Sequence, residues 1–304
     1  MPKPEWPAAE RALLLRLVQD GKSPYQCFEE FQQSGIARSQ KAVVRKIQNE
    51  TAKAPHLWHA MIRPSPVAPL HVHQAVVKAD KCLCLFDIHA PFHDPAWLNR
   101  LMAIALRRGA EDCIIGGDLI DFSALNHFGR QKGVETEAEV DAAEHVVKML
   151  AATFQRVLLF AGNHELRLPK KLDYLLSLEK TMEDFIVSAN VSVSDYQWCE
   201  LRSGGETYYI EHPKNASVVP VMVPRKLAAK YHQNVVAGHG HLAGMSRDDS
   251  NRYWAIDSGV CCDPRKLAYV QKVHNTRPQV MQGAVLVERG IPILLTPQNA
   301  SLYE

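Results

Sequence analysis

Side chains able to bind a metal ion or transfer a proton recur in this sequence where short apolar runs end. The five segments are DIH at 87–89, GGDLID at 116–121, GNHE at 162–165, EH at 211–212 and GHGH at 238–241. Their carboxylates, amide and imidazoles suit hard or borderline divalent cations. The absence of thiolates among them disfavours a closed structural zinc site. A carboxylate between two ions, with imidazoles on each side, is the arrangement of two-metal hydrolases.

The elements that would carry these segments alternate between residues 80 and 198. Strands are predicted at 81–87, 112–118 and 156–162, and helices at 95–109 and 135–154. This order predicts an α/β domain with parallel strands, whose sites form beyond the carboxyl ends of the strands. A glycine precedes each of Asp118, Asn163 and His239, and we expect it to let the backbone turn sharply there.

In this order, the five motifs resemble those of the calcineurin-like metallophosphoesterase superfamily, over roughly residues 81–296. The resemblance implies that family's α/β fold, two mixed β-sheets sandwiched between helices. It implies one metal ion held by Asp87, His89, Asp118 and His241, and a second held by Asp118, Asn163, His212 and His239. Asp118 would then bridge both ions, and His164 would contact the phosphate and donate a proton as the catalytic residue.

The fourth motif departs from the family pattern, because Pro213 stands after His212 where a glycine is usual. Proline restricts the preceding residue to extended backbone, which a ligand at a strand end tolerates. His232, at the end of an apparent helix, is the competing candidate, although we favour His212. His93 lies four residues after His89 and is expected to form a hydrogen bond to a ligand.

Two further residues are candidates for substrate binding. Arg167 follows GNHE, and together with the long insert between the second and third motifs it gives a looser resemblance to phosphoesterases of phages and mobile elements. Arg167 could bind a phosphate oxygen pair in a bidentate way. An ion pair with Glu165 or a solvated position on a helix is the alternative. His127, in the loop after the second motif, is expected to line the cleft.

The first 56 residues differ from the rest and predict three short helices. Ser23 and Gln26 form a capping-box pattern, with Pro24 at the first helical position. Three helices with tight turns resemble the Myb/homeodomain-like helix-turn-helix family. The expected DNA-binding face of the third helix consists of Arg38, Lys41, Arg45 and Gln48. A solvated surface helix is the alternative interpretation.

Three domain segments follow from these patterns. A helix-turn-helix-like domain is predicted at 1–56, a proline-containing linker at 57–79 and the metallophosphoesterase domain at 80–304. The linker carries Pro64, Pro66 and Pro69, which favour an extended spacer.

Composition limits the remaining possibilities. The 304 residues include 35 basic and 33 acidic side chains, so a nucleic-acid surface must be local. No apolar run approaches the 18 residues of a membrane span, and the amino terminus lacks a secretory signal pattern. Seven cysteines without metal-site spacing favour a reducing compartment, and we expect a cytoplasmic protein with no membrane partner. The oligomeric state stays open.

The sequence therefore predicts a dinuclear metal-dependent phosphodiesterase that acts on nucleic acid, a nuclease, by attack of a hydroxide bridging the two metals. Mn²⁺ is the first expectation for both ions, with Zn²⁺, Fe, Ni²⁺ and Co²⁺ as alternatives, and DNA is the expected partner. The competing function is a phosphomonoesterase, a protein or nucleotide phosphatase, whose amino-terminal domain serves docking or oligomerisation. A DNA-binding regulator with a decayed enzyme core is disfavoured by the full ligand set.

Overall fold

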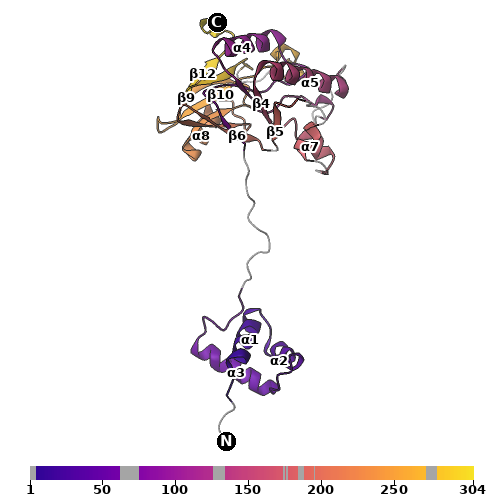
Figure 1. The fold of residues 1–304 in the computed structure, drawn as a ribbon, viewed down its shortest axis with the longest axis vertical. Coiled ribbons are helices and arrows are strands. Elements are labelled where there is room, and N and C mark those ends of the chain that lie inside the picture. The colour runs from indigo at the N-terminus through magenta and orange to yellow at the C-terminus, as the bar shows by residue number, and fades with distance from the viewer. Residues whose placement is uncertain are drawn as a thin grey trace. The chain divides into compact units, whose positions relative to one another are not determined.

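The computed structural model describes residues 5–61, 75–125, 134–173, 175, 177–183, 188–194, 196–271 and 279–304. The chain separates into two compact units, Met1–Val72 and His73–Glu304 (Figure 1). His127 and the three linker prolines lie outside the described residues. Among the described helices, none combines the length and the apolar character that a membrane crossing requires.

The amino-terminal unit contains α1 (Ala8–Gln19), α2 (Pro24–Gln33) and α3 (Gln40–Lys53). As the sequence predicts, α2 starts with a capping box: the Gln26 backbone N–H donates to Ser23 Oγ, and the Ser23 N–H donates to Gln26 Oε1. The three helices enclose a small core of Leu14, Leu17, Cys27, Phe31, Val43 and Trp58. This unit therefore has a hydrophobic core of its own.

The larger unit contains two six-stranded mixed sheets. The order in one is β12-β11-β2-β3-β4-β5, in which β2 to β5 are parallel and β11 and β12 antiparallel. Its strands are β2 (Lys81–Leu85), β3 (Asp112–Ile115), β4 (Arg156–Phe160), β5 (Val191–Ser194), β11 (Ala284–Glu288) and β12 (Ile291–Leu295). The central strands are buried on both faces, which explains their continuous apolar sequences.

The second sheet has the order β1-β6-β7-β8-β10-β9. Its strands are β1 (Val76–Lys78), β6 (Trp198–Ser203), β7 (Glu206–Glu211), β8 (Asn234–Ala237), β9 (Ala243–Arg247) and β10 (Trp254–Ser258). The strands β7, β8 and β10 run parallel to one another, so their carboxyl ends meet at one edge.

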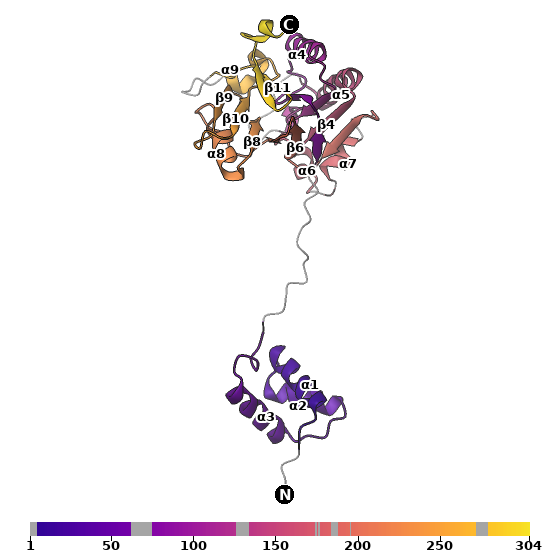
Figure 2. The same cartoon turned by 60° about the vertical axis from the view of Figure 1, so that its left-hand side comes forward.

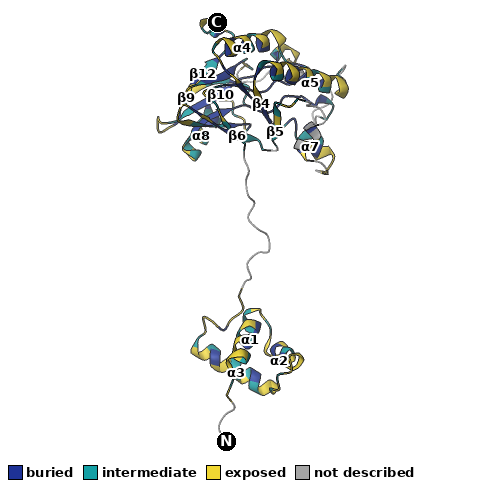
Figure 3. Ribbon diagram, viewed as in Figure 1, coloured by how far each residue is buried: buried dark blue, intermediate teal, exposed yellow. Residues whose placement is uncertain are grey.

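Helices cover the outer faces of the two sheets. α4 (Pro95–Arg107) and α5 (Thr136–Thr153) lie together on the first sheet, and α8 (Met222–Tyr231) packs on the second (Figures 1 and 2). The face of each helix toward its sheet is buried and the opposite face exposed (Figure 3). Between the sheets lies an apolar layer that includes Phe86, Phe160 and Tyr208. This arrangement confirms the predicted fold class.

Several elements escape the sequence pattern because they are short. They include the edge strands β1, β5 and β9. The short helices are η1 (Ser123–Leu125), α6 (Arg167–Lys171), α7 (Leu178–Glu183), η2 (Pro264–Lys266), α9 (Ala268–Gln271) and η3 (Ala300–Leu302). The strands β2, β3 and β4 also end two or three residues earlier than predicted, which places the motif residues in turns rather than in strands.

Candidate metal centre

The motif residues lie in turns at the carboxyl ends of strands from both sheets. Asp87 and His89 follow β2, Asp118 follows β3, Asn163 follows β4, His212 follows β7, and His239 and His241 follow β8. The turns after β2 and β3 stay joined by backbone hydrogen bonds, because the N–H groups of Asp87 and His89 donate to the carbonyls of Gly117 and Asp118. The parallel strands thus bring the ends of neighbouring turns together.

Five of these residues have left-handed backbone conformations. The φ angles are 51° at Asp87, 49° at His89, 53° at Asp118, 65° at His239 and 59° at His241. A positive φ is uncommon outside glycine and costs on the order of 1–3 kcal/mol, and such residues concentrate at functional sites. The strain therefore lies in the ligand candidates themselves.

The glycines before the ligands have a different role from the one expected. Gly117 does have a positive φ, +87°, but Gly162 and Gly238 do not. A Cβ on Gly162 would lie 2.1 Å from Asp118 Oδ1, and a Cβ on Gly238 would lie 2.9 Å from Asp87 Oδ2. These two glycines are required because other atoms occupy the space of a side chain, the ligand candidate Asp118 at Gly162 and both the Phe86 ring, at 2.5 Å, and Asp87 at Gly238.

All seven expected ligands converge. Their donor atoms form overlapping groups, each within 4.8 Å, namely Asp87–His89–His241, His89–Asp118–His164 and Asp118–His212–His239. Asn163 Oδ1 joins the last group at 3.1 Å from His212 Nε2. The alternative His232 is exposed beyond the end of α8 and belongs to none of these groups. The structure thus brings His212, and not His232, into the site.

The surroundings of His212 fit a cation. Its Nδ1 faces the Gly116 carbonyl at 3.0 Å, so that nitrogen carries the proton of a neutral ring. Nε2 faces two oxygen atoms, Asn163 Oδ1 at 3.1 Å and Asp118 Oδ2 at 3.3 Å, and carries a proton toward them when the ring is charged. A divalent ion between these atoms would take the place of the Nε2 proton, and a ligand imidazole held through its other nitrogen is the usual arrangement.

His89 shows the same pattern on the other side of Asp118. Its Nδ1 lies 3.0 Å from Asp121 Oδ1, and its Nε2 faces Asp87 Oδ1 at 3.7 Å and Asp118 Oδ2 at 3.9 Å. Among the described residues, the buried atoms His89 Nε2 and Asp118 Oδ2 have no hydrogen-bond partner. Buried polar atoms without partners require an explanation, and bound ions on both sides of Asp118 provide one.

The charges of the site also favour cations. Although burial disfavours charge on Asp87, the imidazoles of His241 and His89 hold the pKa of this carboxyl well below its ordinary value. Burial likewise disfavours imidazolium, yet the carboxylates of Asp121 and Asp87 raise the pKa of His89 to about 10. Asp118 similarly raises the pKa of His212 to about 9, against the effect of burial. The carboxylates therefore favour positive charge at the positions of these imidazole nitrogens.

His164 belongs to one of these donor groups, and Arg167 lies next to it. The His164 Nδ1 is 3.1 Å from Asp121 Oδ1 and 2.9 Å from the Asp121 carbonyl. Arg167 donates one hydrogen bond to His164 Nε2 at 2.9 Å and another to the Asp121 carbonyl at 2.6 Å. This guanidinium is anchored next to the cluster and makes no ion pair with Glu165 among the described contacts, and its role in substrate binding stays a prediction.

Two site residues were missed by the sequence analysis. Asp121 lies within 3.1 Å of both His89 and His164, and its position three residues after Asp118 in the same motif was an available signal. Glu165 is buried and accepts hydrogen bonds from three backbone N–H groups of the ligand turns. Its only signal was an acidic residue at the end of GNHE.

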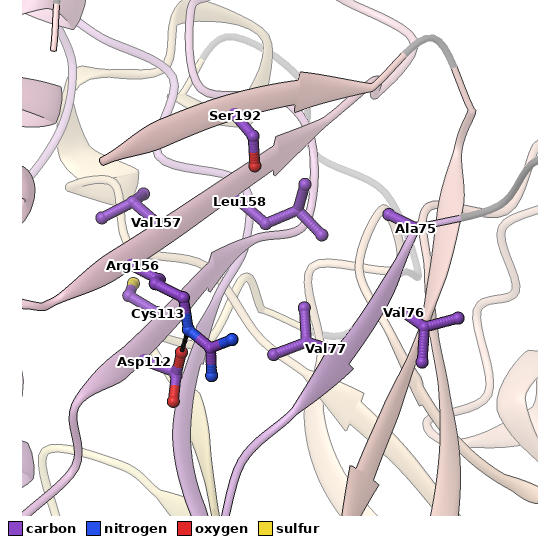
Figure 4. Close-up of a pocket in the computed structure, with 9 residues that line it drawn as sticks. All are labelled: Ala75, Val76, Val77, Asp112, Cys113, Arg156, Val157, Leu158 and Ser192. Atoms are coloured by element: carbon purple, nitrogen blue, oxygen red, sulfur yellow. Dashed lines mark hydrogen bonds and ion pairs between the residues drawn. The ribbon is translucent and has the colours of Figure 1, made fainter. Parts of the chain in front are cut away.

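Two cavities among the described residues of the larger unit are lined by residues outside this cluster. One of about 160 Å³ opens at the amino-terminal ends of β3 and β4, where Arg156 pairs with Asp112 at 2.6 Å (Figure 4). Another of about 90 Å³, between α4 and α5, is lined by His93. The expectation that His93 bonds to a ligand is wrong, since its buried Nδ1 has no partner among the described residues.

Only three of the four residues expected to bind DNA share an exposed surface of α3, and DNA binding by that surface stays a prediction. Arg38 precedes α3, and its guanidinium donates to Glu10 at 2.8 Å and lies 4.7 Å from the centre of the Trp6 ring. Arg38 is therefore not part of the exposed surface of α3, because its guanidinium is engaged by Glu10 of α1 and by Trp6, which precedes α1. Three residues of the face, Lys41, Arg45 and Gln48, are exposed on α3.

Among known proteins, this chain resembles solved structures but matches no family model and no curated sequence. A phosphoesterase, Yfce, from E. coli is 15% identical, with a TM-score of 0.39 over 68% of this chain and 88% of that chain. Vacuolar Protein Sorting 29 from Cryptosporidium parvum is 12% identical, with a TM-score of 0.38 over 71% and 96%.

A third solved structure, Phosphopantetheinyl Hydrolase (PptH) from Mycobacterium tuberculosis, is 14% identical, with a TM-score of 0.34 over 62% of this chain and 91% of that chain. The chemistry of the centre is indicated by its own geometry rather than by these distant likenesses.

Proposed function

We propose that this protein is a metal-dependent phosphoric ester hydrolase whose active site is the cluster around Asp118. The observation that carries the proposal is the convergence of carboxylate and imidazole donors on both sides of one buried carboxylate oxygen that has no partner among the described residues. Oxygen and imidazole donors suit Mn²⁺, Zn²⁺, Fe, Ni²⁺ or Co²⁺, and Mn²⁺ is our first choice.

Two divalent ions held there would neutralise the charge of a phosphate ester and lower the pKa of water to near neutrality. The chain's own contribution is orientation. Asp121 fixes the His164 ring through Nδ1, which leaves Nε2 directed toward the cluster, 3.7 Å from Asp118 Oδ2. When a phosphate oxygen accepts the hydrogen bonds of the Arg167 guanidinium, His164 Nε2 would be released, and once protonated it would be able to donate to the leaving oxygen.

The finer part of the proposal is that the substrate is a phosphodiester of nucleic acid. The surface of α3 in the amino-terminal unit supports a nucleic-acid substrate. The only acidic residue of this helix, Glu50, is buried and paired with Arg11 and Lys46. The exposed surface of α3 therefore presents cations and amides without a competing carboxylate, including Lys41 and Arg45, a composition suited to phosphates and base edges.

Hydrolysis of bis-p-nitrophenyl phosphate and of p-nitrophenyl phosphate, each with Mn²⁺, tests the reaction class. We expect the diester to be cleaved with the higher kcat/KM, and the activity to disappear after chelation and return with Mn²⁺. Preference for the monoester would instead favour the phosphatase alternative. Activity that survives complete metal removal would contradict a metal-dependent hydrolase of either kind.

Binding of the full chain to a fluorescent DNA duplex tests the nucleic-acid part. The double variant Lys41→Ala/Arg45→Ala should bind more weakly, with a salt slope lower by about two units, because each lost phosphate contact removes about one. A matched control, Arg16→Ala/Lys22→Ala, removes the same charge from α1 and the turn after it and should retain the wild-type slope. Equal losses in both variants would show that only overall charge matters.

A further inference from the structure

Glu165 links the two turns that carry the central ligands of the site. Its carboxylate is 1% exposed and lies in the turn after β4. Its Oε2 accepts hydrogen bonds from the backbone N–H groups of Asp118 and Gly162, both at 2.8 Å, and its Oε1 accepts one from Ile120 at 3.2 Å. One side chain thus joins the turn after β3 to the turn after β4.

The link is reciprocal. Asp118 Oδ1 accepts the backbone N–H of His164 at 2.8 Å, so each turn holds the other through a carboxylate and a backbone donor. Because Oδ1 is engaged in this way, Oδ2 is the oxygen left facing His89 and His212. The orientation of the central carboxylate therefore depends on the distance between the two turns, which Glu165 spans.

We infer that Glu165 is a positioning residue that aligns Asp118 and the Asn163 turn for metal binding without itself being a ligand. This inference rests on the proposed function, because it assumes that the cluster binds metal. Glu165 directs both oxygens at backbone donors, and neither belongs to the groups of potential ligand atoms. Loss of such a supporting contact typically lowers metal affinity or activity about 10–100-fold.

The test is calorimetric titration of Mn²⁺ into the metal-free full chain. Glu165→Gln keeps the shape of the side chain but presents an NH₂ group where an acceptor is needed. We expect its dissociation constants for Mn²⁺ to rise about 10–100-fold. The electron paramagnetic resonance spectrum should also change from that of a coupled Mn²⁺ pair to that of isolated ions, a signature that lower stability alone does not produce.

Asp248→Asn is the matched control. The buried Asp248 carboxylate also accepts three backbone N–H groups, those of Ser250, Arg252 and Tyr253, in the turn between β9 and β10, which carries no ligand. We expect its Mn²⁺ affinity to stay within about twofold of wild type, because removal of a carboxylate at a turn without ligands leaves the cluster unchanged.

The outcomes distinguish a failure of the positioning role of Glu165 from a failure of the proposed metal-dependent function. If wild type binds two Mn²⁺ and Glu165→Gln binds them equally well, the inference is wrong and the proposed function stands. An equal loss in Asp248→Asn would assign the effect to general destabilisation and also overturn the inference. If wild type binds no metal, the proposed function fails first. Should circular dichroism show Glu165→Gln unfolded, Glu165→Asp, which keeps the charge but is one methylene shorter, replaces it with the same expected loss.

Discussion

At the scale of single residues, the centre is defined by which nitrogen of each histidine is already engaged. His89 and His212 use Nδ1 for Asp121 and for a backbone carbonyl, so both Nε2 atoms face carboxylate oxygens. His164 is different, because Arg167 covers its Nε2. We therefore expect the first two to hold metal and His164 to act on the substrate.

The variant His164→Ala should keep its metal and lose turnover. Loss of general acid help typically lowers kcat about 10²–10⁴-fold. The loss should be largest for esters with poor leaving groups, which need the proton most. A series of aryl phosphodiesters with leaving groups of increasing pKa measures this, and metal analysis of the same samples is the control. An equal loss across the series would contradict a proton-donating role.

At the scale of elements, the sequence predicts the parallel strands and the order of the ligands, since apolar runs and the residues that follow them are local signals. All seven ligand candidates and His164 lie after such runs, while their roles follow from the resemblance to the metallophosphoesterase motifs and stay predictions. The left-handed conformations of Asp87 and His89 could not, because they result from bonds to the neighbouring turn after β3. Arg38 was misplaced for a similar reason, since its partner Glu10 lies in another helix.

The close approach of two turns gives a direct prediction for Gly162→Ala. The added Cβ would lie 2.1 Å from Asp118 Oδ1 and 2.4 Å from the Asp118 backbone nitrogen, so the turn must move. We expect a loss of about 1–3 kcal/mol in the free energy of unfolding, together with weaker Mn²⁺ binding.

Gly205→Ala is the control for Gly162→Ala. Gly205 has a φ of +85°, and a Cβ added there would have no described atom within 4 Å. Strain alone should cost about 1–2 kcal/mol without changing Mn²⁺ affinity. Calorimetric titration and thermal unfolding of both variants measure the two effects. Unchanged Mn²⁺ affinity in Gly162→Ala would show that the contact between the turns does not matter for binding.

A pH dependence is expected for the helical unit. Lys46 and Arg11 hold the pKa of Glu50 below its ordinary value, against the effect of burial. Because the pKa of Glu50 is lower in the folded than in the unfolded state, the ionised carboxylate stabilises the fold at pH values above the unfolded pKa of about 4.3. This stabilisation is lost as the pH falls through the folded-state pKa. Glu50→Gln should therefore lose about 1–3 kcal/mol at pH 7 and show little further loss below pH 4.

Amide hydrogen exchange of α1 and α3 in the full chain, corrected for intrinsic rates, measures the Glu50 effect. Glu29→Gln, an exposed acidic position on α2, is the control and should keep the wild-type pH dependence. If the stability of Glu50→Gln falls with decreasing pH as much as that of wild type, Glu50 is not the source of the pH dependence.

At the scale of the whole molecule, the proposed function assigns a different role to each of the two compact units. Only the larger unit brings together donors for metal ions, among the residues that the structure describes. The helical unit presents an exposed cationic helix and has a core of its own. A metal-dependent reaction combined with a separate surface for an anionic polymer is the organisation that the proposed nucleic-acid substrate requires.

The metal content of Mn²⁺-loaded protein tests the central claim most directly. Elemental analysis of wild type after removal of free metal should find two equivalents per chain. Asp118→Asn, which removes the charge of the only carboxylate shared between the two ligand sets, should retain less than one. Two equivalents in wild type and an undiminished content in Asp118→Asn would contradict a dinuclear centre bridged by this carboxylate.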